Sequence, residues 1–186
     1  DTGNTGFMLL CASLVMLMTP GLAFFYGGLV GRSNTLTIMI QSFASMGITT
    51  VLWWAVGYSL CFSGGSDGIF GNFHNAFLNH VGVNSMYAPA GIPLSVFIVY
   101  QMMFAIITPA LITGSFAERV RFSSYLLFMC LFSIFIYSPL AHWTWHPDGF
   151  LHKLGVGTGN TAQAELSDDG PVAGGNRQPM WRSFGH

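Results

Sequence analysis

Four stretches of the sequence contain no Asp, Glu, Lys, Arg or His, and each is long enough to cross a lipid bilayer. They run over residues 7–30, 36–62, 93–117 and 122–141. A membrane-spanning helix needs about 20 predominantly apolar residues. Inside hydrocarbon every backbone polar group must be bonded within the segment, which favours helices. The sequence therefore predicts four transmembrane helices.

The composition supports this interpretation. Charged residues make up only 7% of the 186 residues, whereas an ordinary soluble domain has roughly 25%. The net charge is -1 and the six basic residues form no cluster, so no nucleic-acid partner is expected. Cys11, Cys61 and Cys130 lie in separate apolar stretches and read as buried thiols. The predicted fold class is an all-α polytopic membrane helix bundle in contact with the lipid bilayer.

Basic residues predict the orientation of the chain. The short connections at 31–34 and 118–121 carry Arg32, Arg119 and Arg121, whereas the long connection at 63–92 has no Lys or Arg. Basic residues concentrate in cytoplasmic connections of membrane proteins. We therefore expect an integral protein of the plasma or cell membrane, with both short connections cytoplasmic and the N-terminus outside.

The sequence divides into two parts. Residues 1–156 contain all four apolar stretches and form one predicted transmembrane domain. Residues 157–186 are rich in Gly, Asp, Ser, Asn and Gln and show no apolar period. Such a composition cannot bury a core, so we predict a disordered tail.

No arrangement of residues points to enzymatic chemistry. The sequence has no Gly-rich phosphate loop and no GxSxG motif, and its acidic residues are scattered. His142 and His146 have a spacing that can hold a metal on a helix, but Pro147 ends the helix and no third ligand is convincing. We expect a polar helix end there, no metal, no cofactor and no enzyme.

Aromatic residues are the candidates for binding. Phe97, Tyr100 and Phe104 fall at i, i+3 and i+7, so they are predicted to share a helix face, while Trp143 and Trp145 lie at the end of the last apolar stretch. One interpretation is a core stripe with an interfacial aromatic belt. The other is a cation-π site at the mouth of a pore, worth about 0.5–2 kcal/mol per ring. Spacing alone favours the first.

Three segments resemble motifs of the ammonium transporter family (Amt/Mep/Rh). They are Pro-Gly-Leu-Ala-Phe-Phe-Tyr-Gly-Gly-Leu at 20–29, Gly-Ser-Phe-Ala-Glu-Arg-Val-Arg-Phe at 114–122, and Tyr-Ser-Pro-Leu-Ala-His-Trp-Thr-Trp at 137–145. The similarity covers about residues 6–156, with the three motifs in family order. The residues that define the first two motifs are Pro20, Gly21, Gly27, Gly28, Glu118 and Arg119.

The resemblance implies a fold of about eleven helices built as inverted halves, of which this chain holds about four, and a trimer with one pore in each protomer. It implies transport of ammonium, which would lose its proton and cross as ammonia. It also implies an outer ammonium site formed by Trp145 and Phe104, with Phe104 as the outer gate and Tyr100 lining the mouth. On this ground the cation-π interpretation becomes the favoured one.

The chain departs from the family pattern after Val156. Family members continue with Leu-Asp-Phe-Ala-Gly-Gly into a fifth helix, whereas this chain continues with Gly-Thr-Gly-Asn. The supporting Asp and the two pore histidines of the family are therefore absent. We expect a transporter truncated before the fifth helix and inactive alone. The alternatives are a non-conducting binding or regulatory subunit in a mixed trimer with full-length homologues, and an unrelated four-helix membrane protein.

Overall fold

The computed structural model describes residues 2–64, 69–82, 84–87, 90–146 and 149–153. The predicted disordered tail at 157–186 lies outside these residues and stays a prediction.

The described residues form four long apolar helical segments, as predicted, over residues 2–29, 35–62, 94–116 and 122–145. The first is the single helix α1, and each of the others is a series of shorter helical pieces. These elements are α1 (Thr2–Leu29), α2 (Thr35–Leu52), η1 (Trp53–Gly57), α3 (Tyr58–Phe62), α4 (Leu94–Ile112), η3 (Thr113–Phe116), α5 (Phe122–Phe132), η4 (Ser133–Tyr137) and α6 (Ser138–Trp145), followed by the short helix α7 (Phe150–Lys153).

Two helix bounds differ from the prediction. The first helix begins at Thr2, because the short polar residues before Phe7 continue the helical turn. The fourth helical segment runs through α6 to Trp145 and does not stop at 141. His142, which served as the stop signal, is fully buried inside the bundle.

The long connection after α3 contains little regular secondary structure. It contains one 3-10 turn and a two-residue antiparallel pair that joins the entrance of α4. These are η2 (Ala76–Leu78), β1 (Met86–Tyr87) and β2 (Ile92–Pro93), with Met86 opposite Pro93.

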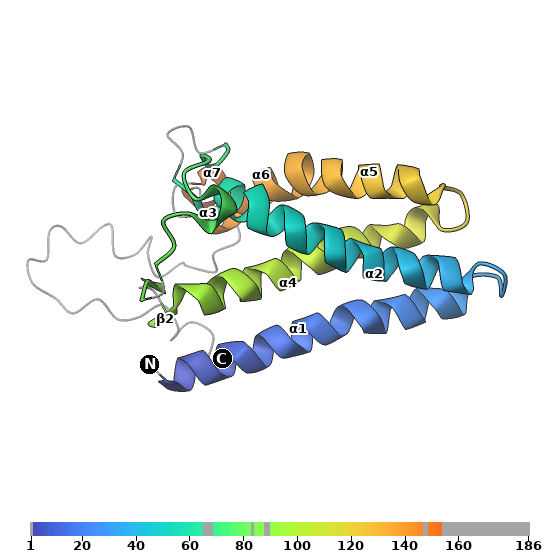
Figure 1. The fold of residues 1–186 in the computed structure, drawn as a ribbon, viewed down its shortest axis with the longest axis horizontal. Coiled ribbons are helices and arrows are strands. Elements are labelled where there is room, and N and C mark those ends of the chain that lie inside the picture. Colours follow the sequence, from blue (N-terminus) through green and yellow to red (C-terminus); the bar gives the residue numbers. More distant parts are fainter. Residues whose placement is uncertain (1, 65–68, 83, 88–89, 147–148, 154–186) are drawn as a thin grey trace, which may run out of the picture.

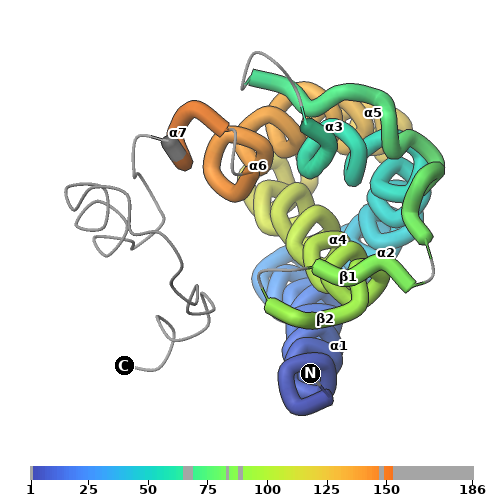
Figure 2. Tube along the Cα trace, turned by 90° about the vertical axis from the view of Figure 1, so that its left-hand side faces the viewer, coloured from blue at the N-terminus to red at the C-terminus, as the bar shows by residue number. Residues whose placement is uncertain are grey.

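Figure 1 shows how the elements are arranged along the bundle axis. The connection between α1 and α2 and the connection between η3 and α5 lie at one end. The N-terminus, the connection between α3 and α4, and α7 lie at the other end. Figure 2, which looks along the bundle from the N-terminal end, shows α4 between α1 and the group formed by α3, α5 and α6. The described chain is therefore an up-and-down helix bundle.

The core lies where the second, third and fourth helical segments meet. Its buried side chains are Trp53, Tyr58, Cys61, Ile98, Ala105, Phe132, Tyr137 and Ala141. At Gly27 the helices α1 and α2 approach closely, since an added Cβ would lie 3.2 Å from Cγ of Met39.

Two π turns interrupt the second and fourth helical segments. In η1 the N–H of Tyr58 donates to the carbonyl of Trp53. In η4 the N–H of Ser138 donates to the carbonyl of Ser133, and the Ser138 hydroxyl donates to the same carbonyl at 2.8 Å. Pro139 has no N–H for the carbonyl four residues before it, which breaks the α-helical ladder at this point.

Candidate functional site

Three aromatic side chains meet near the end of the bundle that carries the N-terminus. The ring centroids of Phe104 and Trp145 lie 6.4 Å apart with their planes at 58°. The ring of Tyr100 meets Phe104 edge to face at 5.0 Å. Trp145 is 46% exposed, while Tyr100 and Phe104 are half-buried. The structure thus brings together the three aromatic residues predicted for an outer mouth.

Two hydrogen bonds hold the end of α6 that carries Trp145. The Nδ1 of His142 lies 2.9 Å from the carbonyl oxygen of Cys61 at the end of α3. Because a carbonyl only accepts, His142 is the donor and its Nδ1 carries the proton. The indole Nε1 of Trp143 donates to the carbonyl of Ile69 at 2.7 Å. Trp143 is therefore hydrogen-bonded to the connection after α3, whereas Trp145 faces Phe104.

The main chain at Phe104 takes part in a hydrogen bond within α4. The hydroxyl of Thr108 donates to the carbonyl of Phe104 at 2.7 Å, one turn further along the helix. Pro109 follows and cannot donate to the carbonyl of Ala105, so one α-helical hydrogen bond is missing just after Phe104.

Phe97 does not join this group, although it has the predicted helical spacing. Its ring stacks on Tyr87 of β1 at 4.0 Å with an angle of 8°, and meets Phe62 edge to face at 5.2 Å. Burial raises the pKa of Tyr87 above the ordinary tyrosine value. Phe97 therefore belongs to a separate aromatic cluster that fixes the entrance of α4.

Aromatic ring faces such as those of Tyr100, Phe104 and Trp145 can attract a cation. A cation within about 6 Å of a ring centroid is attracted by the ring quadrupole. In the part of the chain that the structure describes, the only carboxylate is Glu118, which lies on the connection before α5 at the opposite end. No group of three metal-ligating side chains occurs among these residues. His142 and His146 stack on each other at 4.5 Å.

At the opposite end of the bundle, the side chain of Glu118 links the two short connections. Its carboxylate accepts hydrogen bonds from the backbone N–H of Gly31 at 2.9 Å and from the side-chain amide of Asn34 at 3.1 Å. These bonds, that from Asn34 first, lower the pKa of the Glu118 carboxyl below its usual range. Glu118 has a positive φ of 66°, and Arg119 closes the turn by donating its N–H to the carbonyl of Phe116.

The glycines of the 20–29 motif on α1 differ in how closely another helix approaches them. The helix continues through Pro20, and Gly27 packs against α2, where the hydroxyl of Thr35 donates to its carbonyl at 3.2 Å. Gly21 and Gly28 have no heavy atom within 4 Å of an added Cβ. Only Gly27 of these glycines is needed for a close approach between the described helices.

Sequence reasoning did not identify His142 as an anchor for the mouth, nor the two π turns. The Ser-Pro pair at 138 and 139 was the available signal, because a proline within a helical pattern marks an interruption.

Comparison with known proteins gives the family. The family model described as Ammonium Transporter Family matches residues 6–169. An ammonium transporter of Bacillus subtilis is 45% identical over 154 residues, which cover 83% of this chain and 38% of the relative. Ammonium transporter 1 of Dictyostelium discoideum is 44% identical over 155 residues, covering 82% of this chain and 33% of the relative. The chain thus spans 33–38% of the length of these relatives.

Solved structures agree with this relationship. The crystal structure of Mep2 from Candida albicans aligns with a TM-score of 0.75 at 28% identity, covering 83% of this chain and 34% of that chain. Mep2 from Saccharomyces cerevisiae aligns with a TM-score of 0.75 at 30% identity and the same coverage. The predicted fold class is confirmed, and the relatives that the chain matches are transporters and not enzymes. This chain is an integral membrane protein that belongs to the ammonium transporter family.

Proposed function

We propose that this chain takes part in transport of ammonium or ammonia across a membrane, with Trp145 and Phe104 recruiting the cation at the outer mouth. The observation that carries this proposal is the ring pair, with centroids 6.4 Å apart and Trp145 46% exposed. Ammonium is a small cation, and an aromatic face attracts a cation by about 0.5–2 kcal/mol. Tyr100 forms a further wall of the mouth through its contact with Phe104.

The same geometry suggests how the cation is handled. Aromatic faces attract a partly desolvated cation without placing a fixed negative charge in the membrane, where charges are expensive. Phe104, half-buried beside Trp145, is the outer gate that a molecule must pass next. The cost of carrying a charge into hydrocarbon favours the passage of neutral ammonia beyond that point.

The proposal extends to how a conducting path is completed. The chain spans 38% of the Bacillus subtilis relative, so we propose that helices beyond these 186 residues form the rest of the path. Those helices can belong to the same polypeptide or to a partner in a trimer, whether of identical or mixed subunits. We expect the 186 residues alone not to conduct.

The test transfers residues 6–153 into the Bacillus subtilis relative in place of the matching segment and measures ammonium uptake at low concentration. Trp145→Leu should raise the half-saturating concentration by about 2- to 30-fold, the equivalent of 0.5–2 kcal/mol. Trp54→Leu is the matched control, because Trp54 is 50% exposed and packs on Phe77, away from the mouth. Equal effects of the two substitutions would contradict the outer site.

The 186-residue chain is tested separately in yeast that lacks its ammonium transporters. No growth rescue at low ammonium is expected when the protein is present in the membrane. Rescue that depends on Trp145 would show that the four helices suffice and would overturn the proposed need for further helices.

We also propose that the N-terminus faces outward at the plasma or cell membrane. The arginine-bearing connections lie at one end of the bundle, which supports this orientation through the positive-inside preference. In a cysteine-free background, Asn79→Cys should react with an impermeant maleimide in intact cells. Ser33→Cys should react only after permeabilisation, and the reverse pattern would contradict the orientation.

A second candidate is a non-conducting binding or regulatory subunit that assembles with full-length homologues. The observation that favours it is the apolar outer face of α1, where Phe24, Phe25 and Leu29 are all more than half exposed. Such a face can pack against another subunit or against lipid. Stable co-purification with a full-length homologue would support this candidate, and clean separation would argue against it.

A further inference from the structure

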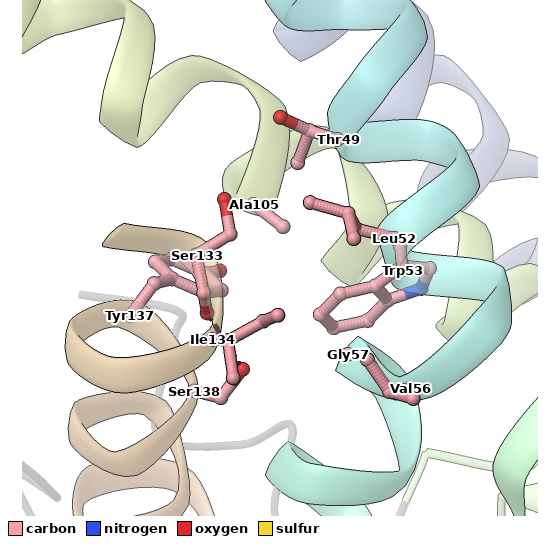
Figure 3. Close-up of a pocket in the computed structure, with 10 residues that line it drawn as sticks. All are labelled: Thr49, Leu52, Trp53, Val56, Gly57, Ala105, Ser133, Ile134, Tyr137 and Ser138. Atoms are coloured by element: carbon pink, nitrogen blue, oxygen red, sulfur yellow. Dashed lines mark hydrogen bonds between the residues drawn. The ribbon is translucent and has the colours of Figure 1, made fainter. Parts of the chain in front are cut away.

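Two hollows among the described residues differ in what they can hold. The cavity between the two π turns, drawn in Figure 3, has a water-accessible volume of about 10 Å³ and an almost wholly apolar accessible surface. A pocket at the end of the bundle that carries the short connections has about 270 Å³ on the same measure. One water molecule needs about 10–15 Å³. Of these two hollows, only the second has both the room for a larger ligand and a charged side chain, Glu118.

The second hollow, here the Glu118 pocket, combines apolar walls with one carboxylate. The end of α1, the start of α2 and the connection before α5 contribute to it. Tyr26 forms a fixed wall, since its hydroxyl donates to the carbonyl of Leu111 at 2.7 Å. The apolar part of the lining consists of Leu29, Val30, Ile38 and Ala117.

One carboxylate oxygen of Glu118 is free to bind a ligand. Both hydrogen bonds to this side chain, from the N–H of Gly31 and the amide of Asn34, end on Oε1. The other oxygen, Oε2, has no hydrogen-bond partner among the described residues. The side chain is exposed, and its lowered pKa keeps it ionised at neutral pH. Charged acceptors of this kind form the stronger hydrogen bonds with cationic donors.

The Glu118 pocket adjoins an exposed apolar surface and two basic residues. Leu29 lines the pocket and is 69% exposed, and Phe25 is 61% exposed. Residues four apart share a helix face, so these two form an apolar strip along α1 that begins at the pocket. Arg32 and Arg119 lie on the two short connections, and both are exposed without an ion-pair partner in the described parts of the chain.

We propose that the Glu118 pocket binds one molecule of phosphatidylethanolamine, whose primary ammonium donates to Oε2 of Glu118. Arginine pairs well with phosphate, so the lipid phosphate lies near Arg32 and Arg119. An acyl chain then covers Phe25 and Leu29 on the membrane-spanning helix α1.

The chemistry of the headgroup separates this lipid from other ligands. Phosphatidylcholine has a quaternary ammonium with no N–H to donate, and phosphatidylglycerol has no cation. A free ammonium ion would leave most of the 270 Å³ unfilled and the apolar walls uncovered. The inference does not depend on the proposed function, because Trp145, Phe104 and Tyr100 do not line the Glu118 pocket. Failure of either proposal leaves the other standing.

Native mass spectrometry of the 186-residue chain tests the proposal. The chain in detergent is titrated with phosphatidylethanolamine or phosphatidylcholine of the same acyl chains. The first lipid bound should have about 1.5- to 5-fold higher affinity when it is phosphatidylethanolamine, the range of an accessible ion pair. Equal affinities would overturn the proposal. In that case, a rise in Tm with ammonium chloride over potassium chloride would assign the pocket to the free ion.

Glu118→Gln isolates the charge. The amide oxygen can still accept from Gly31 and Asn34, while the NH₂ that replaces Oε2 cannot accept from an ammonium. The preference for phosphatidylethanolamine should disappear in this variant. Ser115→Ala is the matched control and should keep the preference, because Ser115 is exposed, donates to the carbonyl of Ile112 and does not line the pocket. A preference that survives Glu118→Gln, or an equal loss in both variants, would overturn the proposal.

Discussion

Tyr125 on α5 donates a hydrogen bond from its hydroxyl to the main-chain carbonyl of Gln41 on α2, across a separation of 84 residues and at a distance of 3.1 Å. The side chain is fully buried, and its hydroxyl also lies 3.4 Å from that of Thr113. The bond ties the second and fourth helical segments together near the end that carries the short connections.

Tyr125→Phe should lower the free energy of unfolding by about 0.5–1.5 kcal/mol. The ring remains in place, so the loss reports the hydroxyl and not the packing. The measurement is equilibrium unfolding in mixed micelles, and an unchanged midpoint would show that the bond contributes nothing.

Gly114 should not tolerate a side chain. An added Cβ would lie 2.7 Å from Cε1 of Tyr26, whose ring is held in place because its hydroxyl donates to the carbonyl of Leu111 at 2.7 Å. Gly114→Ala should therefore cost about 1–3 kcal/mol of stability, the usual range for overpacking.

The matched control is Gly28→Ala on α1. No heavy atom lies within 4 Å of an added Cβ there, and alanine is the better helix former by about 1 kcal/mol. Thermal unfolding should show a loss for Gly114→Ala and none for Gly28→Ala. Similar shifts for the two variants would mean that Tyr26 moves aside freely.

Glu118 should make stability depend on pH. Hydrogen bonds from Asn34 and Gly31 lower the pKa of its carboxyl in the folded chain. The stabilisation is therefore complete above the pKa of an unfolded glutamate, about 4.3, and is lost as the pH falls through the lower folded value. In Glu118→Gln this component of the acid-induced fall in Tm should disappear. A Tm profile identical to that of the unsubstituted chain would exclude the charge as the cause.

His142 should position the end of α6. His142→Leu removes the donor to the Cys61 carbonyl and should cost about 1–3 kcal/mol. His142→Asn places an amide near the position of Nδ1 and should recover part of this loss. Thermal unfolding of the two variants gives the comparison, and equal destabilisation would assign the effect to packing of the imidazole.

The number of helices was predictable because a charge-free length is a property of the sequence alone. The end of the fourth helical segment was not, because a histidine within an apolar run can be either a surface residue or a buried donor. The buried Nδ1 of His142 is satisfied by the Cys61 carbonyl. That partner comes from a distant part of the chain.

The candidate site shows the same limit. Helical spacing predicts that Tyr100 and Phe104 lie on one face, and their rings are in contact. Spacing also includes Phe97, which instead stacks on Tyr87 of the connection before α4. The position of Trp145 beside Phe104 depends on how α6 packs against α4, which local patterns do not encode. Similarity to a family supplied that residue, and its role in binding stays a prediction.

The π turn η4 has a consequence for the direction in which Trp145 points. Each residue advances an α-helix by about 100°, so a turn that contains one extra residue offsets the angular phase of everything after it by about that amount. Tyr125 and Trp145 lie on opposite sides of η4, and one faces α2 while the other faces Phe104. Deleting one residue within Ser133–Tyr137 would remove the extra residue of the π turn and rotate Trp145 away from its partner ring. The length of this segment, more than its side chains, therefore aims the tryptophan.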